Sequence, residues 1–421
     1  MHYILIFLMF IFNNSVYALN IDETIKSTIE KNPKVKIAIE KLNESKELIE
    51  SAYGKKLPSI NSTISGTYSN AESKTSSITT TPETFTDRYK ISITQNIIDG
   101  GIKNLEIKRS KILYDNEVIN FQKTIQDLIL SAINGYLTVI NYNKSLIANQ
   151  KNFDSVSRFL EETKTRFNLG SATLYDLQNA ESAYAIAETN LFAAQNNYDV
   201  SKITFKNIVG LNPVNLEEVV DFKQDLNLEK IISNALNNNY EILLIKNEIE
   251  NKKILLAKEK KSKNPSLDIT ASAEYSDSGR IDNGSEKTDS SIGLTLTIPI
   301  FSQNLDISDR RKYRSQILQS ELNLEDISND ISIQAANLYK DYLISKSNIS
   351  SNIKQIQSIE TSLESIKEEY NIGTKSINQL IEAESDLLSV NVNYFASRKE
   401  FILNYFNIKA LEGSIIDLFK D

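Results

Sequence analysis

The feature that most constrains this chain is an internal repeat that covers nearly all of its 421 residues. Gly170 and Gly373 lie 203 positions apart, and so do Gly210 and Gly413. Four further identities keep this offset: Leu177 with Leu380, Ala180 with Ala383, Glu181 with Glu384, and Ser182 with Ser385. A repeat of this length predicts one duplicated structural unit and not a solenoid of short repeats. After residue 18 we expect a first half at 19–212, a linker at 213–226, a second half at 227–415 and a tail at 416–421.

The first half carries a long run of hydrophobic residues on one seven-residue register, which is the pattern of a coiled-coil helix. The run consists of Leu105, Ile112, Ile119, Ile133, Ile140 and Ile147, and it is broken only by Gln126. The pattern predicts a helix over residues 101–167 that is about 100 Å long, with a counterpart over residues 304–370. A chain that contains two such rods cannot fold into one compact globule.

A glycine interrupts the helical pattern at two tips. Gly170 and Gly373 permit the left-handed backbone that ends one helix before the next begins. The hydroxyl side chains that follow, Ser171 and Thr374, are expected to cap the next helices. The predicted tips are residues 168–173 and 371–375, and the helices after them are residues 174–210 and 376–412. Each half therefore contains a long helical hairpin.

Two segments in each half alternate apolar and polar residues, as strands with two different faces do. A shorter helix precedes them, over residues 21–53 in the first half. The four predicted strands are residues 59–70, 88–98, 266–276 and 290–300. A half-buried soluble sheet would alternate in the same way, but the long polar loops after the first and third strands favour a transmembrane barrel. Four strands are too few to enclose a pore, whereas three chains that share one barrel would supply twelve.

The first 18 residues are predicted to be a secretory signal peptide. Tyr3 to Phe12 form an apolar core, and Val16-Tyr17-Ala18 resembles a cleavage site with a small residue at its end. An N-terminal anchor helix is the alternative, although the apolar run is short for a membrane span. No later segment has the roughly 18 apolar residues that a membrane helix needs, so any insertion into a membrane is expected to use the strands.

Composition excludes several classes of function. The chain has no cysteine and its only histidine is His2, which leaves no disulfide, no thiolate nucleophile and no metal site built from Cys or His. Its net charge of −8 argues against binding of nucleic acid, which needs a basic face. No motif gathers the carboxylate, tyrosine, serine and lysine side chains into a catalytic site. We therefore expect neither an enzyme nor a cofactor.

Several motifs resemble the TolC family of outer-membrane channel proteins. They are Asn32-Pro33, Asp99-Gly100-Gly101 after the second strand, and the tip sequence RFNLG at 166–170 with DLQNA at 176–180. With the signal peptide and the two halves, the resemblance covers nearly the whole mature chain. It implies a mixed α/β membrane protein and a homotrimer. Twelve strands would form a β-barrel in the outer membrane, and twelve antiparallel coiled-coil helical segments would form an α-barrel in the periplasm.

The resemblance also implies a function and its partners. The family is a passive exit duct for type I protein secretion, for multidrug efflux, or for both. A periplasmic adaptor (membrane fusion) protein and an inner-membrane transporter of the ABC or RND type would supply cargo and energy. Outer-membrane lipid would surround the barrel.

Five residues near the tips receive roles from this resemblance. Gln379 and Glu382 would line the constriction, where three copies of Glu382 would repel one another and favour cations. The alternative is that Glu382 is an ordinary solvated helix residue. Asp176 on the first tip would form a latch with Tyr370 and Lys375 on the second. Lys375 stands where the family usually has an arginine. An arginine could make a two-pronged contact with the Asp176 carboxylate, whereas the lysine ammonium offers only a single point charge.

Other classes of protein remain open at this stage. A periplasmic adaptor also has a long helical hairpin, but it would have one hairpin flanked by small β-domains. A structural coiled-coil protein of the cell envelope, without a pore, would not need paired strands between its helices. An enzyme is the hardest class to sustain. Outer-membrane location and ion conductance would separate the channel from all three.

Overall fold

The structure is a computed structural model that describes seven stretches of the chain: residues 19–70, 73–75, 78–80, 83–219, 226–279, 285–301 and 303–419. The expected signal peptide and residues 220–225 of the expected linker lie outside the described residues. The chain divides into two compact units. Unit 1 comprises Met1–Ala38, Phe121–Ile242 and Ile327–Asp421, and unit 2 comprises Ile39–Asn120 and Leu243–Asp326.

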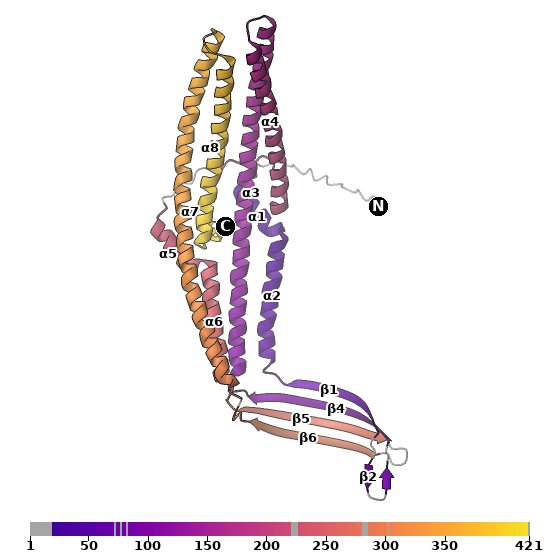
Figure 1. Ribbon diagram of the computed structural model, residues 1–421. Coiled ribbons are helices and arrows are strands. Elements are labelled where there is room, and N and C mark those ends of the chain that lie inside the picture. Colours follow the sequence, from indigo (N-terminus) through magenta and orange to yellow (C-terminus); the bar gives the residue numbers. More distant parts are fainter. Residues whose placement is uncertain are drawn as a thin grey trace, which may run out of the picture. The chain divides into compact units, whose positions relative to one another are not determined.

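Helices account for most of the described residues (Figure 1). They are α1 (Ile21–Lys31), α2 (Pro33–Gly54), α3 (Ile102–Asn168), α4 (Leu174–Val209), α5 (Leu228–Asn238), α6 (Tyr240–Lys260), α7 (Leu305–Asn371), α8 (Ile377–Leu411) and the 3-10 helix η1 (Ile415–Phe419). The strands are β1 (Ser59–Asn70), β2 (Ser73–Thr75), β3 (Ile78–Thr80), β4 (Glu83–Ile98), β5 (Ser266–Gly279) and β6 (Ser285–Thr297).

The single first helix expected over residues 21–53 is wrong, because the chain breaks it at Asn32. Pro33 has no backbone N–H and disfavours helical backbone at the residue before it, and Asn32 is extended (φ −70°, ψ 127°). The Asn32 side chain donates a hydrogen bond of 3.1 Å to the Ile208 carbonyl. In the second half Asn239 separates α5 from α6 and donates to the Leu411 carbonyl at 3.1 Å. In both halves, therefore, an asparagine between the two short helices forms a hydrogen bond to a backbone carbonyl near the end of a hairpin.

The two long helices dominate the fold. α3 and α7 each have 67 residues, which corresponds to about 100 Å at 1.5 Å per residue. Their ends lie within one residue of those expected from the heptad pattern. In unit 1, α3 and α4 form one antiparallel hairpin, and α7 and α8 form a second (Figure 1).

The core of unit 1 draws apolar side chains from both hairpins and from the short helices. Phe205 of α4, Ile408 of α8 and Ile415 of η1 have no exposed surface. Tyr136 of α3 is 1% exposed, and its hydroxyl lies 2.9 Å from the Leu19 carbonyl oxygen and 2.7 Å from that of Glu217. The start of the described chain and the linker are therefore fastened to the same helix.

Unit 2 contains an antiparallel sheet of four strands in the order β1-β4-β5-β6, which lie side by side in Figure 1. β1 has the bounds expected from the sequence. β4 and β6 each begin five residues earlier than expected, because pairing with neighbouring strands continues through polar residues such as Thr84 and Thr288. β2 and β3 form a separate two-stranded ladder within the loop that follows β1.

The register of the sheet places its apolar side chains on one face. Directly opposite residues share a face, and Ile60 pairs with Ile93, Ile91 with Ala273, and Leu294 with Ile269. The face consists of Ile60, Ile64, Tyr68, Phe85, Tyr89, Ile91, Ile93, Leu267, Ile269, Ala271, Ala273, Tyr275, Ile292, Leu294 and Leu296. The other face carries charged and hydroxyl groups, among them Glu274, which pairs with Arg88 at 2.8 Å and with Lys90 at 3.6 Å.

Candidate functional site

Both hairpin tips close with the same backbone motif. Gly170 has φ 76° and Gly373 has φ 81°, in the left-handed region that glycine adopts without strain. At the first tip the Gly170 N–H donates to the Phe167 carbonyl at 2.9 Å, and the Ser171 N–H donates to the Arg166 carbonyl at 2.8 Å. The second tip repeats this pair of bonds from Gly373 and the residue after it. This is the Schellman arrangement, and it satisfies carbonyls that a helix end leaves free.

The helix caps at the tips lie two residues beyond those expected. The N-caps are Thr173 and Ser376, each of which accepts a hydrogen bond from the backbone N–H three residues on. The prediction of Ser171 and Thr374 as caps is therefore wrong. Their hydroxyls instead donate backward to carbonyls of the preceding helix, at 3.0 Å and 2.9 Å. A Ser or Thr three residues before Asp176 or Gln379 is the capping-box pattern, which would have identified the correct positions.

Asp176 and Gln379 occupy equivalent places in these two capping boxes. The Asp176 carboxylate accepts from the Thr173 N–H at 3.0 Å, and the Gln379 amide oxygen accepts from the Ser376 N–H at 3.1 Å. One expected latch residue and one expected constriction residue thus hold the starts of α4 and α8. The first tip carries a negative charge at this place, whereas the second tip is neutral.

Tyr370 joins the two hairpins near their tips. Its ring, on the last turn of α7, lies under the Arg166 guanidinium of α3 with 4.5 Å between the guanidinium carbon and the ring centre. The side chain is 5% exposed, and its hydroxyl has no hydrogen-bond partner among the described residues. Burial, followed by the negative charge of Glu162, raises the pKa of Tyr370 to about 12. The hydroxyl therefore stays protonated at physiological pH, and the Glu162 carboxylate, which pairs with Arg166 at 2.7 Å, lies close enough to accept a hydrogen bond from it.

The other expected site residues lie apart from this contact. Lys375 approaches Glu369 of its own hairpin at 3.8 Å and forms no ion pair with Asp176 among the described residues. Glu382 is exposed on α8, one turn beyond Gln379, and has no ion-pair partner among the described residues. An ion pair that the sequence analysis missed lies inside the second hairpin, between Lys367 and Glu384 at 2.9 Å. Glu384 was noted only as a repeat identity, and its buried position gave no signal in the sequence.

An apolar cluster lies next to the second tip, between the ends of α7 and α8 and the helix α3. It combines Leu363 and Tyr370 of α7, Ile377 and Leu380 of α8, and Phe159 of α3. Phe159 comes from the other hairpin, so the two hairpins share a small core just behind the tips. Any change at Tyr370 therefore acts on a contact between hairpins as well as on one tip.

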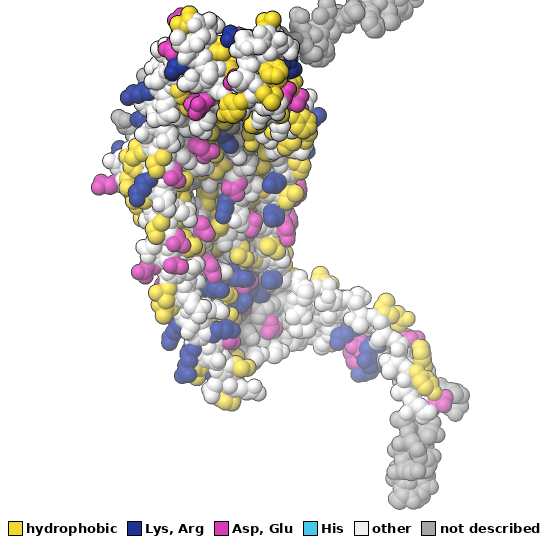
Figure 2. All heavy atoms as spheres, turned by 45° about the horizontal axis from the view of Figure 1, so that its top comes forward, with side chains coloured by type: hydrophobic (Ala, Val, Ile, Leu, Met, Phe, Trp, Pro, Cys, Tyr) yellow, Lys and Arg dark blue, Asp and Glu magenta, His cyan; other side chains and the backbone are white. Residues whose placement is uncertain are grey.

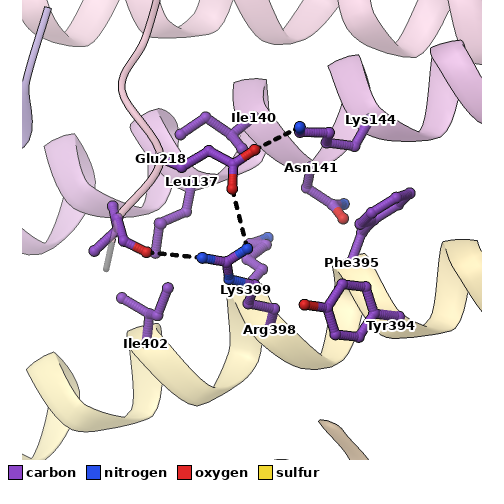
Figure 3. Close-up of a pocket in the computed structure, with 11 residues that line it drawn as sticks. Leu137, Ile140, Asn141, Lys144, Glu218, Tyr394, Phe395, Arg398, Lys399 and Ile402 are labelled. Atoms are coloured by element: carbon purple, nitrogen blue, oxygen red, sulfur yellow. Dashed lines mark hydrogen bonds and ion pairs between the residues drawn. The ribbon is translucent and has the colours of Figure 1, made fainter. Parts of the chain in front are cut away.

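The linker is held between the hairpins by one carboxylate (Figure 3). Glu218 pairs with Lys144 of α3 at 2.5 Å and with Arg398 of α8 at 3.1 Å. Arg398 also donates to the Val219 carbonyl at 3.0 Å. These groups border a cavity of about 220 Å³ whose wall includes Tyr394. The hydrogen bond from Lys144 is the main influence on Glu218 and lowers its pKa.

The apolar face of the sheet is open to its surroundings in the single chain. Ile64 is 72% exposed, Ile292 is 76% exposed and Leu294 is 69% exposed. A continuous apolar face of this extent is unfavourable in water and marks a surface that contacts lipid or another protein. Tyr89 and Tyr275 lie on the same face with their ring centres 6.2 Å apart.

No helix among the described residues is long and apolar enough to cross a membrane. Within the same part of the chain, no group of three or more His, Cys, Asp or Glu residues is placed to hold a metal ion.

Comparison with known proteins places the chain in a family. The family model for outer membrane efflux proteins matches residues 24–211 and 231–414, which are the two halves of the repeat. The chain therefore belongs to the outer membrane efflux protein family, to which the TolC channels also belong.

Individual relatives are distant in sequence. The chain is 24% identical to outer membrane protein TolC of Escherichia coli over 405 residues, which cover 90% of this chain and 77% of that protein. It is 20% identical to the outer membrane efflux protein BepC of Brucella suis, over 78% of this chain and 72% of that protein.

Solved structures share the fold at still lower identity. The CmeC outer membrane channel of Campylobacter jejuni superposes with a TM-score of 0.76 at 15% identity, covering 94% of this chain and 86% of that one. The MtrE outer membrane channel of Neisseria gonorrhoeae has a TM-score of 0.72 at 14% identity, over 94% and 89% of the two chains.

Proposed function

We propose that three copies of this chain form an outer-membrane channel that serves as a passive exit duct, with its helical tunnel in the periplasm. The observation that carries the proposal is the four-stranded sheet with one exposed apolar face and one polar face. Four strands cannot enclose a pore, but twelve strands from three chains can, with the apolar face toward lipid and the polar face toward the lumen.

Exposed apolar side chains on the hairpins support assembly. α4 leaves Phe192 71% exposed and Ile203 62% exposed, and α7 leaves Ile333 58% exposed. Ile186 and Val200 of α4 and Ile344 of α7 are exposed in the same way. Monomeric soluble proteins rarely expose apolar patches of this kind, because a partner usually covers them. Packing of each hairpin against one from a neighbouring subunit would close a ring of helices.

The tunnel would narrow at the second tip. Glu382 is exposed and unpaired among the described residues, and Gln379 lies one turn before it on α8. In a trimer three Glu382 carboxylates would form a ring that attracts cations. Because Gln379 is neutral, this ring carries at most one carboxylate per subunit at these two positions. Weak cation selectivity is the expected result.

The tips would be held closed by a latch between Asp176 and the second hairpin. Tyr370 offers a buried, protonated hydroxyl that makes no well-formed hydrogen bond, and the Asp176 charge, after burial and Glu162, is one of the influences that raise its pKa. Rotation of the Asp176 carboxylate out of its capping box would bring an acceptor to that hydroxyl. Lys375 would contribute a second, solvent-screened contact, which is worth little by itself.

Partners would deliver the cargo. We infer that a periplasmic adaptor docks at the helical tips and that an inner-membrane transporter of the ABC or RND type supplies the energy. BepC and the CmeC and MtrE structures carry the words efflux or channel in their names, which favours drug efflux or type I secretion for this chain too.

Location and subunit number test the proposal together. After expression of the full chain in a Gram-negative host, membranes are separated on a density gradient and the detergent-extracted protein is weighed by native mass spectrometry. We expect the protein in the outer-membrane fraction with a mass of three mature chains. A soluble periplasmic monomer would overturn the proposal and favour an adaptor or a structural envelope protein without a pore.

A further inference from the structure

The connections between the helices and the sheet of unit 2 all lie at one end of that sheet. β1 and β5 begin there and β4 and β6 end there, since Ser59 pairs with Thr94 and Ser266 pairs with Thr297. The end of α2, the start of α3, the end of α6 and the start of α7 therefore meet at this edge. We call these four segments the collar: residues 51–58, 99–111, 258–265 and 303–314.

The collar concentrates positive charge in an acidic protein. It contains fourteen Lys and Arg residues and five Asp and Glu residues, although the whole chain has a net charge of −8. In Figure 2, Lys and Arg side chains gather on the helix ends next to the strands. Like charges at this density repel one another unless an anion lies among them.

The acidic residues of the collar are largely occupied by neighbours. Glu106 pairs with Arg109 at 3.2 Å and with Lys258 at 2.9 Å. Asp306, which is 3% exposed, pairs with Arg310 at 2.7 Å and with Lys263 at 3.0 Å. Seven collar cations remain exposed and have no ion-pair partner among the described residues: Lys55, Lys56, Lys108, Lys111, Lys260, Arg311 and Arg314. Two of these seven make other contacts, since Lys56 donates a hydrogen bond to Asn104 and Lys111 lies over the Tyr53 ring.

The collar begins where the apolar sheet surface ends, and its free cations lie in the loops and first or last helical turns that follow. Ile98 is 50% exposed at the end of β4, Leu296 is 60% exposed at the end of β6, and Ile298 just beyond it is 57% exposed. An apolar band followed at once by long basic side chains matches the order of acyl chains and phosphates in a bilayer leaflet. Lys and Arg place their apolar stems along such a boundary and their charges in the headgroup layer.

We propose that the collar binds the phosphate headgroups of anionic phospholipids, in the leaflet from which the helices emerge. The inference rests on the proposed membrane location of the sheet and adds a lipid preference to it. Each Lys or Arg close to an anionic surface contributes about 1 kcal/mol, or roughly fivefold in binding. The attraction falls off over about 10 Å at 0.1 M salt, so it acts on lipids in contact with the collar.

The test uses a tryptophan reporter, because the chain contains no tryptophan. The variant Ile298→Trp places the reporter at the end of the apolar face next to the collar. The full mature protein is reconstituted into phosphatidylcholine vesicles in which brominated phosphatidylglycerol or brominated phosphatidylcholine replaces part of the lipid. Bromine quenches tryptophan on contact, so the two titrations give the relative affinity of the boundary for each lipid. We expect a preference for phosphatidylglycerol of about fivefold or more.

Two charge variants in the reporter background separate the collar from net charge. The collar variant combines Lys108→Gln, Lys260→Gln, Arg311→Gln and Arg314→Gln. The matched control removes four exposed lysines elsewhere that have no ion-pair partner among the described residues: Lys26→Gln, Lys36→Gln, Lys151→Gln and Lys354→Gln. We expect the collar variant to lose the preference to within twofold of unity, and the control to keep it.

The outcomes distinguish the lipid preference from the proposed function. Equal quenching by both lipids, or an unchanged preference in the collar variant, overturns the collar proposal while the sheet remains in lipid. No quenching by either lipid shows that the sheet is not in the bilayer and overturns the proposed function. If the collar variant does not fold, a salt titration of the reporter protein decides, since 0.5 M NaCl must reduce a preference that arises from charge.

Discussion

The hydroxyl of Tyr370 offers a direct test of the tip geometry. The variant Tyr370→Phe keeps the ring under Arg166 and removes only the buried hydroxyl, which makes no well-formed hydrogen bond among the described residues although the Glu162 carboxylate lies near it. Leaving such a donor unpaired costs about 1–3 kcal/mol, and a hydrogen bond to a carboxylate contributes about 1.5–3 kcal/mol. Removing the hydroxyl therefore relieves the unlatched tip and deprives the latched tip of its bond to Asp176.

Both effects shift the balance toward the unlatched tip. The cost of the unpaired donor alone, about 1–3 kcal/mol, corresponds to roughly a fivefold to hundredfold change in the ratio of latched to unlatched states. Single-channel recording measures that ratio as the time spent in closed and open levels. We expect Tyr370→Phe to shorten the closed times by at least fivefold.

The matched control is Tyr175→Phe on the first turn of α4, where the side chain is 69% exposed. It removes the same atom from a solvated position and is expected to leave the closed times unchanged. If the closed times of the Tyr370→Phe channel equal those of the parent protein, the hydroxyl plays no part in a latch and that proposal is refuted.

Three further variants test other parts of the account. Gly170→Ala places a Cβ on left-handed backbone and is expected to destabilise the first tip by about 1–2 kcal/mol, which would appear as faster amide hydrogen exchange at the tip. The control Gly54→Ala, at the end of α2, is expected to leave amide hydrogen exchange unchanged. Phe205→Ala empties a fully buried site and should lower the free energy of unfolding by about 3–5 kcal/mol, whereas Phe192→Ala, exposed on the same helix, should weaken only trimer assembly in native mass spectra. Glu218→Gln should cost about 0.5–1 kcal/mol at pH 7. Since the folded pKa of Glu218 is depressed, its stabilisation is present above the usual pKa of glutamate and is lost as pH falls through the folded value, so the melting temperature of the variant should fall less on acidification.

The periodic elements could be read from the sequence because one residue pattern governs each of them. The heptads of the first half placed α3 to within one residue, and the repeat placed α7 equally well as its counterpart. The glycines at 170 and 373 marked turns that require left-handed backbone. The family resemblance then led to the fold that the comparisons support.

Two local details were predicted wrongly although short-range sequence signals for them were present. At each tip two hydroxyl residues precede the next helix, and the sequence analysis chose the first, although the capping-box spacing to Asp176 and Gln379 selects the second. The break at Asn32 was missed even though Pro33 signals it. In both cases the local signal for the correct structure was present in the sequence and was overlooked.

Long-range contacts had no signal in the sequence at all. Glu218 is an ordinary linker glutamate until the fold brings Lys144 and Arg398 to it from two different hairpins. The stack of Arg166 on Tyr370 likewise joins helices that are far apart in the chain. Such contacts follow from packing, which a single sequence does not encode in any pattern of neighbouring residues.

Ion conductance of the purified mature protein in planar lipid bilayers tests the central claim most directly. The account predicts small, cation-selective current steps that grow when Glu382→Ala and Asp176→Ala are combined, because the variant lacks both the charged ring and the latch. Steps unchanged by these substitutions would keep the channel and place its gate elsewhere. No current from protein shown to be folded and inserted would contradict the claim that this chain forms a duct.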